Sequence, residues 1–144
     1  MLAGVLALSA LAASAHEGAT GLVKERMDSM SAIAESMKAL GGMVKSGEVD
    51  GAQAAALGAR VAEEARKVPD LFAQEELQPM SEARPEIWQD FADFTAKAEA
   101  MSAAAATLAA QAPATLDRAT LGKALGDIGA TCKACHEVYR VKKN

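Results

Sequence analysis

Two cysteines and a histidine near the carboxyl end of the 144-residue chain have the types and spacing to do chemistry. Cys132 and Cys135 are the only cysteines, and His136 follows directly. Residues three apart on a helix lie on one face, about one turn apart. C-x-x-C-H is the attachment signature of a c-type haem, in which the thiols bond to the porphyrin edge and the imidazole binds iron. The motif predicts one covalent haem c, with Cys132 and Cys135 as anchors and His136 as the axial ligand.

Three other uses of this motif compete with haem attachment. A thioredoxin-like redox pair belongs in a βαβ context, which the sequence does not show. A structural zinc site needs four ligands, and only His136 and His16 could join the two cysteines. A disulfide between residues i and i+3 of a helix is awkward, because bridged Cβ atoms must come within about 4.5 Å. Haem attachment is therefore the favoured interpretation.

The amino-terminal stretch, residues 1–15, is uncharged and made of apolar or small residues. Ala13-Ser14-Ala15 fits the small-x-small rule for signal peptidase, so we expect a signal peptide at 1–15 and a mature domain at 16–144. One feature departs from the usual pattern, since no Lys or Arg precedes the apolar run. The stretch is short for a bilayer span, which takes roughly 20 residues, and we expect no membrane span in the mature chain.

Composition limits the remaining function classes. The net charge of −4 and the isoelectric point near 5.2 give no sign of a nucleic-acid partner, which usually needs a basic face. A chain of this length suits one compact domain. It carries only five aromatic residues, so its core is short of bulky rings. Either a large bound group supplies that bulk, or the core is a tight bundle lined by alanine.

Apolar residues recur at three- and four-residue steps, the period of a helix face and not of a strand. They predict helices over residues 20–46, 51–68, 85–111 and 116–141. Gly47 is the expected stop of the first run, and Asp50 the expected N-cap of the second. Pro69 should end the second run, and Pro85 should open the third near its first helical position. For the fourth run, either Thr115 or Asp117 can serve as N-cap.

These runs predict an all-α fold, because no segment of the chain reads as a strand. Long helices with short connections favour an antiparallel up-down four-helix bundle, whose interior commonly houses cofactors. Residues 69–83 form the one long connection. The expected architecture is a four-helix bundle that encloses a covalently bound haem.

Three stretches together resemble a known family. They are Arg26-Met27-Asp28-Ser29-Met30, the run from Ala83 to Trp88 with the sequence ARPEIW, and the run from Gly129 to Arg140 that contains the C-x-x-C-H motif. A C-x-x-C-H near the carboxyl end of a four-helix bundle resembles the class II c-type cytochromes, in particular cytochrome c-prime. The resemblance implies thioether anchors at Cys132 and Cys135 and a proximal iron ligand at His136.

The same resemblance implies roles for five further residues. It places Met30 over the distal face of the haem and Arg26, one turn earlier, near a haem propionate. Arg84 and Glu86 match the segment that lines the haem edge, and Arg140 would flank the proximal pocket. Three of them have a plainer interpretation. Met30 belongs to a methionine stripe typical of a core, Arg26 could be an ordinary surface side chain, and Arg140 could simply complement the helix dipole.

The resemblance implies a periplasmic haem protein that binds NO and CO at a five-coordinate iron. Such proteins are usually homodimers. An electron-transfer role with an unknown redox partner is also possible. If the sulfur of Met30 binds iron, the site becomes six-coordinate and low-spin and the protein an electron carrier. A more remote alternative is a haem-free exported helical binding module with a CxxC redox pair. We expect no enzymatic activity, because two histidines leave no room for a Ser/His/Asp site and the first helix offers no distal base.

Overall fold

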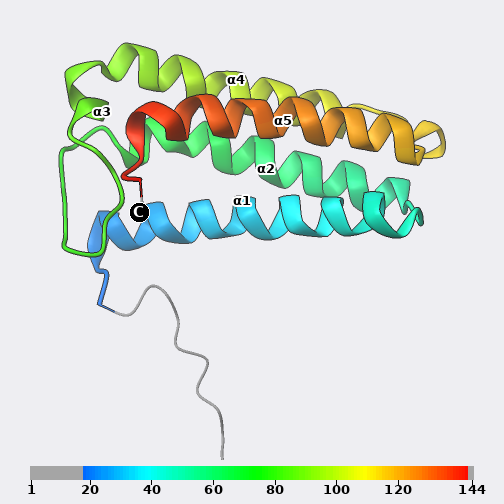
Figure 1. Cartoon of the computed structure of the whole chain (residues 1–144), viewed down its shortest axis with the longest axis horizontal. Helices are drawn as coiled ribbons and strands as arrows, with labels where there is room; N and C mark the ends of the chain where they lie inside the picture. Colours follow the sequence, from blue (N-terminus) through cyan, green and yellow to red (C-terminus); the bar gives the residue numbers. More distant parts are fainter. Residues whose placement is uncertain (1–17, 143–144) are drawn as a thin grey trace, which may run out of the picture.

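The computed structural model describes residues 18–142, so the predicted signal peptide and His16 lie outside the described residues. Four long helices run antiparallel side by side, which confirms the predicted bundle (Figure 1). Among residues 18–142 there is no strand, and no helix there is long and apolar enough to cross a membrane. The elements in chain order are α1 (Gly21–Ser46), α2 (Gly51–Leu71), α3 (Glu86–Gln89), α4 (Phe91–Ala109), the 3-10 turn η1 (Pro113–Thr115) and α5 (Arg118–Tyr139).

Three predicted helix boundaries are confirmed, each by a local hydrogen bond. Gly47 ends α1 in the left-handed region, with φ of 81°, and its N–H donates to the carbonyl of Met43. Glycine suits this position because it has no Cβ to clash. Asp50 caps α2 and Asp117 caps α5, each accepting a backbone N–H three residues on. Thr115, the other candidate cap, lies in η1.

The prediction that α2 stops before Pro69 is wrong. The helix continues through Pro69 to Leu71. Proline has no backbone N–H, so Pro69 removes one hydrogen bond from the last turns of the helix. Two other hydrogen bonds at the end of α2 can offset that loss. The N–H of Phe72 still donates to the carbonyl of Val68, and the Arg26 guanidinium of α1 donates to the carbonyl of Leu71.

The prediction of one unbroken helix over 85–111 is also wrong. Asp90, with φ of −133° and ψ of 63°, breaks it into the single turn α3 and the longer α4. Its side chain accepts the N–H of Asp93 and so caps α4. At the far end α4 stops at Ala109, and α5 occupies 118–139 of the predicted 116–141.

Packing is tightest between α2 and α4 and looser between α1 and α5. At Gly58 of α2, an added Cβ would lie 3.0 Å from Cγ of Leu108 and 3.2 Å from the carbonyl oxygen of Ala105. Ser102 of α4 donates across the same interface to the carbonyl of Ala62, at 3.0 Å. Small residues let these two backbones approach closely, as expected for an alanine-rich bundle.

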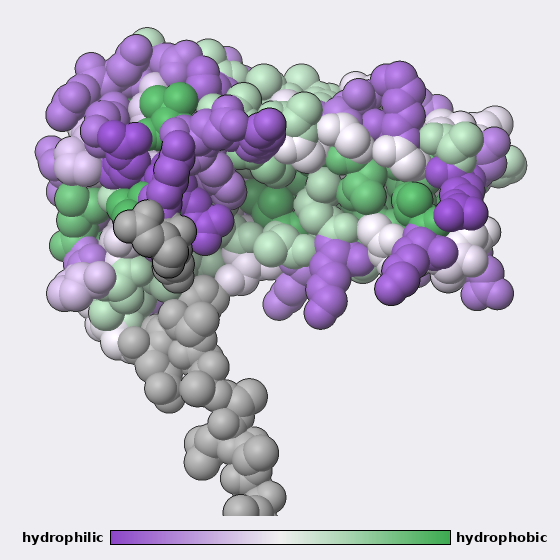
Figure 2. Space-filling model, viewed as in Figure 1, coloured by the Kyte–Doolittle hydropathy of each residue, from purple (hydrophilic) through white to green (hydrophobic). Residues whose placement is uncertain are grey.

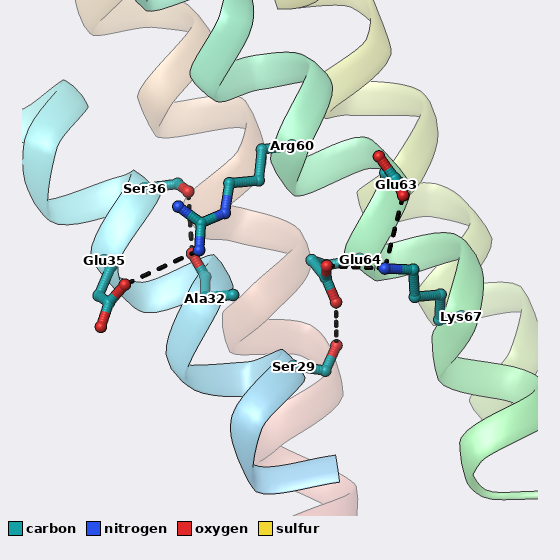
Figure 3. A network of polar contacts seen from close by, with 8 residues as sticks. All are labelled: Ser29, Ala32, Glu35, Ser36, Arg60, Glu63, Glu64 and Lys67. Carbon is teal, nitrogen blue, oxygen red and sulfur yellow. Dashed lines mark hydrogen bonds and ion pairs between the residues drawn. The ribbon is translucent and has the colours of Figure 1, made fainter. Parts of the chain in front are cut away.

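Polar side chains join α1 to α2 (Figure 3). Ser29 donates to Glu64 at 2.8 Å, and the other oxygen of Glu64 accepts from Lys67 at 2.8 Å. These two hydrogen bonds, that from Lys67 first, lower the pKa of Glu64. Further along, Arg60 and Glu35 approach to 3.9 Å but are both largely exposed, so their pairing contributes little.

A substitution at Gly51 tests the contact between α2 and η1. A Cβ there would fall 2.0 Å from the backbone carbonyl oxygen of Pro113, so one backbone must move. We expect Gly51→Ala to lower the free energy of unfolding in urea by about 1–3 kcal/mol, the usual range for overpacking. Gly126→Ala is the matched control, because an added Cβ meets nothing within 4 Å; it should be neutral or stabilising by up to about 1 kcal/mol. Equal effects at the two sites would contradict the close contact.

Candidate haem site

The C-x-x-C-H motif occupies the end of α5, with its two thiols turned towards the bundle interior. Cys132 and Cys135 are half-buried, are not joined in a disulfide and pack against the core. Sγ of Cys132 lies 3.9 Å from Sδ of Met101 on α4. His136, the next residue, is exposed. The arrangement puts both thiols on the inner face of α5 and the imidazole at its edge.

Burial raises the pKa of both thiols, and that of Cys135 to about 11. Both are therefore protonated at neutral pH. A redox pair works through a thiolate, which needs a lowered pKa and an electropositive setting. The raised values argue against the haem-free CxxC alternative. They are compatible with thiols that lie against a large apolar group.

The imidazole of His136 is placed to stay neutral at physiological pH. Although the residue is largely exposed, the surrounding protein partly desolvates its ring and so lowers its pKa. The positive charge of Arg140 lowers the pKa further, and Glu82 opposes both effects. Neutral imidazole is the form that binds a metal. Among residues 18–142, no group of three or more His, Cys, Asp or Glu side chains could hold a metal ion, so these residues do not support a zinc site.

An apolar furrow follows the loosely packed boundary between α1 and α5 (Figure 2). Hydrophobic side chains, in green, show at its floor, and polar side chains, in purple, project from the α1 edge. At one end the helices touch, since added Cβ atoms at Gly41 and Gly122 would each lie 3.8 Å from a side chain of the other helix. At the end nearer the motif, half-buried Met30 of α1 and Cys132 of α5 both pack against the core.

Arg26 makes contacts within the protein that differ from the role near a haem propionate that the resemblance implies. Its side chain is only 3% exposed and donates to the carbonyls of Leu71, Gln74 and Glu76, at 2.6–2.7 Å. The guanidinium also lies 4.6 Å from the ring centroid of Phe72. Burial lowers the pKa of Arg26, while Glu76 acts in the opposite direction. In the structure Arg26 therefore fixes the connection that follows α2, and its propionate role stays a prediction.

Arg84 and Glu86 pair with each other at the start of α3. Arg84 also donates from Nη1 to the carbonyl of Val138 at 2.6 Å, and from its backbone N–H to the carbonyl of Tyr139 at 3.0 Å. Arg140 pairs with Glu82, with Nε 2.6 Å from Oε2. Arg84 and Arg140 thus lie beside the end of α5, close to His136, while Met30 and Arg26 belong to the facing helix.

Tyr139 and Asp93 are site residues that the sequence did not reveal. The ring of Tyr139 is 4% exposed, and its hydroxyl donates to Asp93 of α4 at 2.6 Å. Lys97 donates to the other oxygen of Asp93 at 2.8 Å, and these two bonds, that of Lys97 first, lower the pKa of the carboxyl. The only sequence signal was the position of Tyr139, three residues after His136, which places both near the helix end.

All five aromatic residues gather at this end of the bundle. Phe94 is central: its centroid lies 5.1 Å from that of Phe72, 6.0 Å from that of Phe91 and 5.3 Å from that of Tyr139, whose ring it meets edge-on. Trp88 donates its indole N–H to the carbonyl of Phe72 at 2.8 Å. The rings form a packed aromatic cluster at the end of the bundle that carries the motif.

The donor set fits haem c. Two unbridged, protonated thiols share the apolar inner face of α5, and a neutral imidazole follows them directly. Sulfur for the porphyrin edge and nitrogen for iron are the groups that covalent haem attachment needs.

Comparison with known proteins decides the family. The model of the family described as Cytochrome C' matches residues 21–140. The chain belongs to the cytochrome c' family. A cytochrome c-556 of Agrobacterium tumefaciens (strain II Chrys) is 36% identical, over 85% of this chain and 99% of that protein. The chain is also 42% identical to a cytochrome c-556 of Agrobacterium tumefaciens (strain apple 185), but over only 65% of that protein. It is 51% identical to a cytochrome c' of Alcaligenes xylosoxydans xylosoxydans over only 48% of that protein.

Solved cytochrome c' structures have the same fold. The protein from Rhodopseudomonas palustris superposes with a TM-score of 0.76 at 29% identity, covering 88% of this chain and all of that one. The nitric oxide complex of a mutant cytochrome c prime from Alcaligenes xylosoxidans gives a TM-score of 0.74 at 33% identity, covering 85% and 94%. Proteins of the cytochrome c' family carry covalent haem c, so the cofactor prediction is confirmed.

The Tyr139–Asp93 hydrogen bond should stabilise the site measurably. We expect Tyr139→Phe, which keeps the ring, to lower the free energy of unfolding of the holoprotein at pH 7, because the hydroxyl that donates to the charged Asp93 is lost. Thr107→Ala, which removes an exposed hydroxyl of α4, is the control and should change little.

The effect of Tyr139→Phe should depend on pH in one direction. The folded pKa of Asp93 lies below its unfolded value, near 3.9. Its stabilisation is therefore complete above that value and is lost as pH falls through the lower folded pKa. The difference between wild type and Tyr139→Phe, measured by urea unfolding, should be constant from pH 5 to 8 and shrink below about pH 4. A difference that grows in acid would contradict the assignment.

Proposed function

We propose that this protein holds one haem c through Cys132, Cys135 and His136 and binds NO or CO at the coordination position opposite His136. The observation that carries the proposal is the placement of two half-buried thiols on the inner face of α5 with His136 directly after them. When bound, haem c supplies an iron that can take up a gas or an electron.

Each residue of the site has a distinct task in this proposal. Cys132 and Cys135 form thioethers and fix the group against the interior of the bundle. His136 contributes a neutral ring nitrogen as the proximal ligand. Met30 is half-buried on the facing helix α1; with haem bound, it would cover the side of the group away from His136 and restrict access to small ligands. Arg26 is held by carbonyls of the connection after α2, so it steadies that part of α1 without being a proton donor to a ligand.

Gas binding is supported by the nitric oxide complex of the Alcaligenes relative. Catalysis is not proposed, because α1 carries no histidine that could act as a distal base. Electron transfer at the same haem is the second role, and it becomes the main one if Met30 sulfur binds iron. The apolar leader and the family resemblance support export to the periplasm.

Replacing Met30 tests both the haem and its distal face. The wild-type protein should keep its Soret band after acid-acetone extraction, since the thioethers are covalent. Its ferric spectrum should be high-spin. We expect Met30→Ala to speed CO binding in flash photolysis by at least about tenfold, a barrier reduction of about 1.4 kcal/mol, because the side chain that blocks the face is gone.

Met37→Ala is the control for Met30→Ala, since Met37 is a half-buried methionine two turns further along α1. It should leave the CO rate within about twofold of wild type, or about 0.4 kcal/mol. A ferric sulfur-to-iron charge-transfer band that disappears only in Met30→Ala would show that Met30 is a ligand. The electron-carrier function would then replace gas binding.

We also propose that the protein forms a homodimer through the exposed faces of α1 and α2, on the strength of the family resemblance. Sedimentation equilibrium at micromolar protein should give a mass near twice that of one chain, which is 14.8 kDa before any cleavage. Glu35→Arg places a like charge beside Arg60 on this face and should weaken the dimer, whereas Lys123→Glu on α5 should not. A single species at the monomer mass would contradict the dimer.

A further inference from the structure

The segment before α3 is paired with the end of α5. Ala83 and Arg140 form an isolated antiparallel bridge, and the N–H of Val141 donates to the carbonyl of Glu82 at 2.8 Å. The N–H of Arg84 donates in turn to the carbonyl of Tyr139. Figure 1 shows the connection between α2 and α3 and the C-terminal residues at the same end of the bundle. We call residues 82–84 with 138–141 the C-terminal clamp.

The clamp supplies what the end of α5 lacks. The last carbonyls of any helix have no partner within it, and a terminal turn frays unless they find one outside. Arg84 satisfies two of them, Val138 from its side chain at 2.6 Å and Tyr139 from its backbone. Its positive charge also lies at the negative end of the helix dipole. One residue therefore caps α5 twice.

The turn that Arg84 caps is the turn that carries His136. The carbonyl of His136 accepts the N–H of Arg140 at 3.3 Å, so the histidine lies within the capped segment. Arg140 is itself fixed by Glu82, with a guanidinium nitrogen 2.5 Å from the carboxylate. From α4, Asp93 holds Tyr139 on the other side of the same turn. Without these contacts the imidazole would sit on a frayed helix end.

We propose that Arg84 is a positioning residue for His136: it holds the last turn of α5 so that the imidazole meets the iron in one orientation. Glu82 assists by holding Arg140. The inference rests on the proposed role of His136 as proximal ligand. It assigns Arg84 to the helix end, whereas the resemblance placed it at the haem edge.

The test compares Arg84→Gln and Arg84→Lys in the holoprotein, with Lys123→Gln as control. Lys123 lies at the other end of α5 in an exposed pair with Asp127, so its replacement removes the same charge away from the clamp. Amide hydrogen exchange of residues 138–141 and the ferric EPR spectrum are measured on each. Haem content is checked by the pyridine haemochrome spectrum.

We expect Arg84→Gln to keep one haem per chain but to speed exchange at 138–141 by about tenfold, because one capping hydrogen bond is lost. Its ferric EPR lines should broaden as the imidazole adopts several orientations, a change that a purely structural role would not produce. Arg84→Lys, which keeps the charge and one donor, should restore both signals. Lys123→Gln should match wild type.

Glu82→Gln is an independent variant that tests the same proposal if Arg84→Gln does not fold. It should speed exchange at Arg140 and Val141 and broaden the same EPR lines. The proposal is overturned if the folded variants keep wild-type exchange, or if exchange rises while the EPR lines stay sharp. If the wild-type protein lacks thioether-bound haem, the proposed function fails instead, and the haemochrome spectrum reports that outcome separately.

Discussion

Fixing the end of α5 is the constraint on which the rest of this structure depends. The chemical motif occupies the last turns of the last helix, where a chain normally frays. Two separate parts of the chain meet that end: α4, through Asp93 and the ring of Phe94, and the 82–84 segment, through Arg84. The position of the motif in the chain therefore explains why so many long-range contacts converge there.

A buried cation secures the opposite side of the site. Arg26 is surrounded by neutral carbonyls and by the faces of two aromatic rings, with no carboxylate directly bonded to it among the described residues. Burying a charge is costly unless it is fully hydrogen-bonded, and three short bonds with cation–π contacts meet that requirement. The side chain ties α1, which carries Met30, to the connection after α2. That connection continues to Glu82 and Arg84, so one stretch of chain contacts both the distal helix and the end of α5.

The α2–α4 interface and the α1–α5 interface are packed differently. Between α2 and α4, glycine and alanine bring the backbones close, and the interface matches the alanine-lined interpretation of the composition. Between α1 and α5 an apolar furrow remains, as the alternative of a bulky bound group requires. The two interfaces thus fit the two interpretations of the aromatic-poor sequence. The rigid pair provides a frame against which the looser pair can enclose a cofactor.

The sequence by itself determined the bundle, most helix boundaries and the haem motif, because each depends on local order. Helix periodicity, the Gly47 and Asp50 signals and the spacing of Cys132, Cys135 and His136 need no partner from elsewhere in the chain. Tertiary structure alone decided the passage of α2 through Pro69 and the pairings of Tyr139 with Asp93 and of Arg84 with Val138. These contacts join residues 46 and 54 positions apart, and no local pattern encodes such a meeting. Arg26 shows the same limit of local patterns. The sequence places it on an apolar helix face, but only the fold brings to it the carbonyl groups that accept its hydrogen bonds.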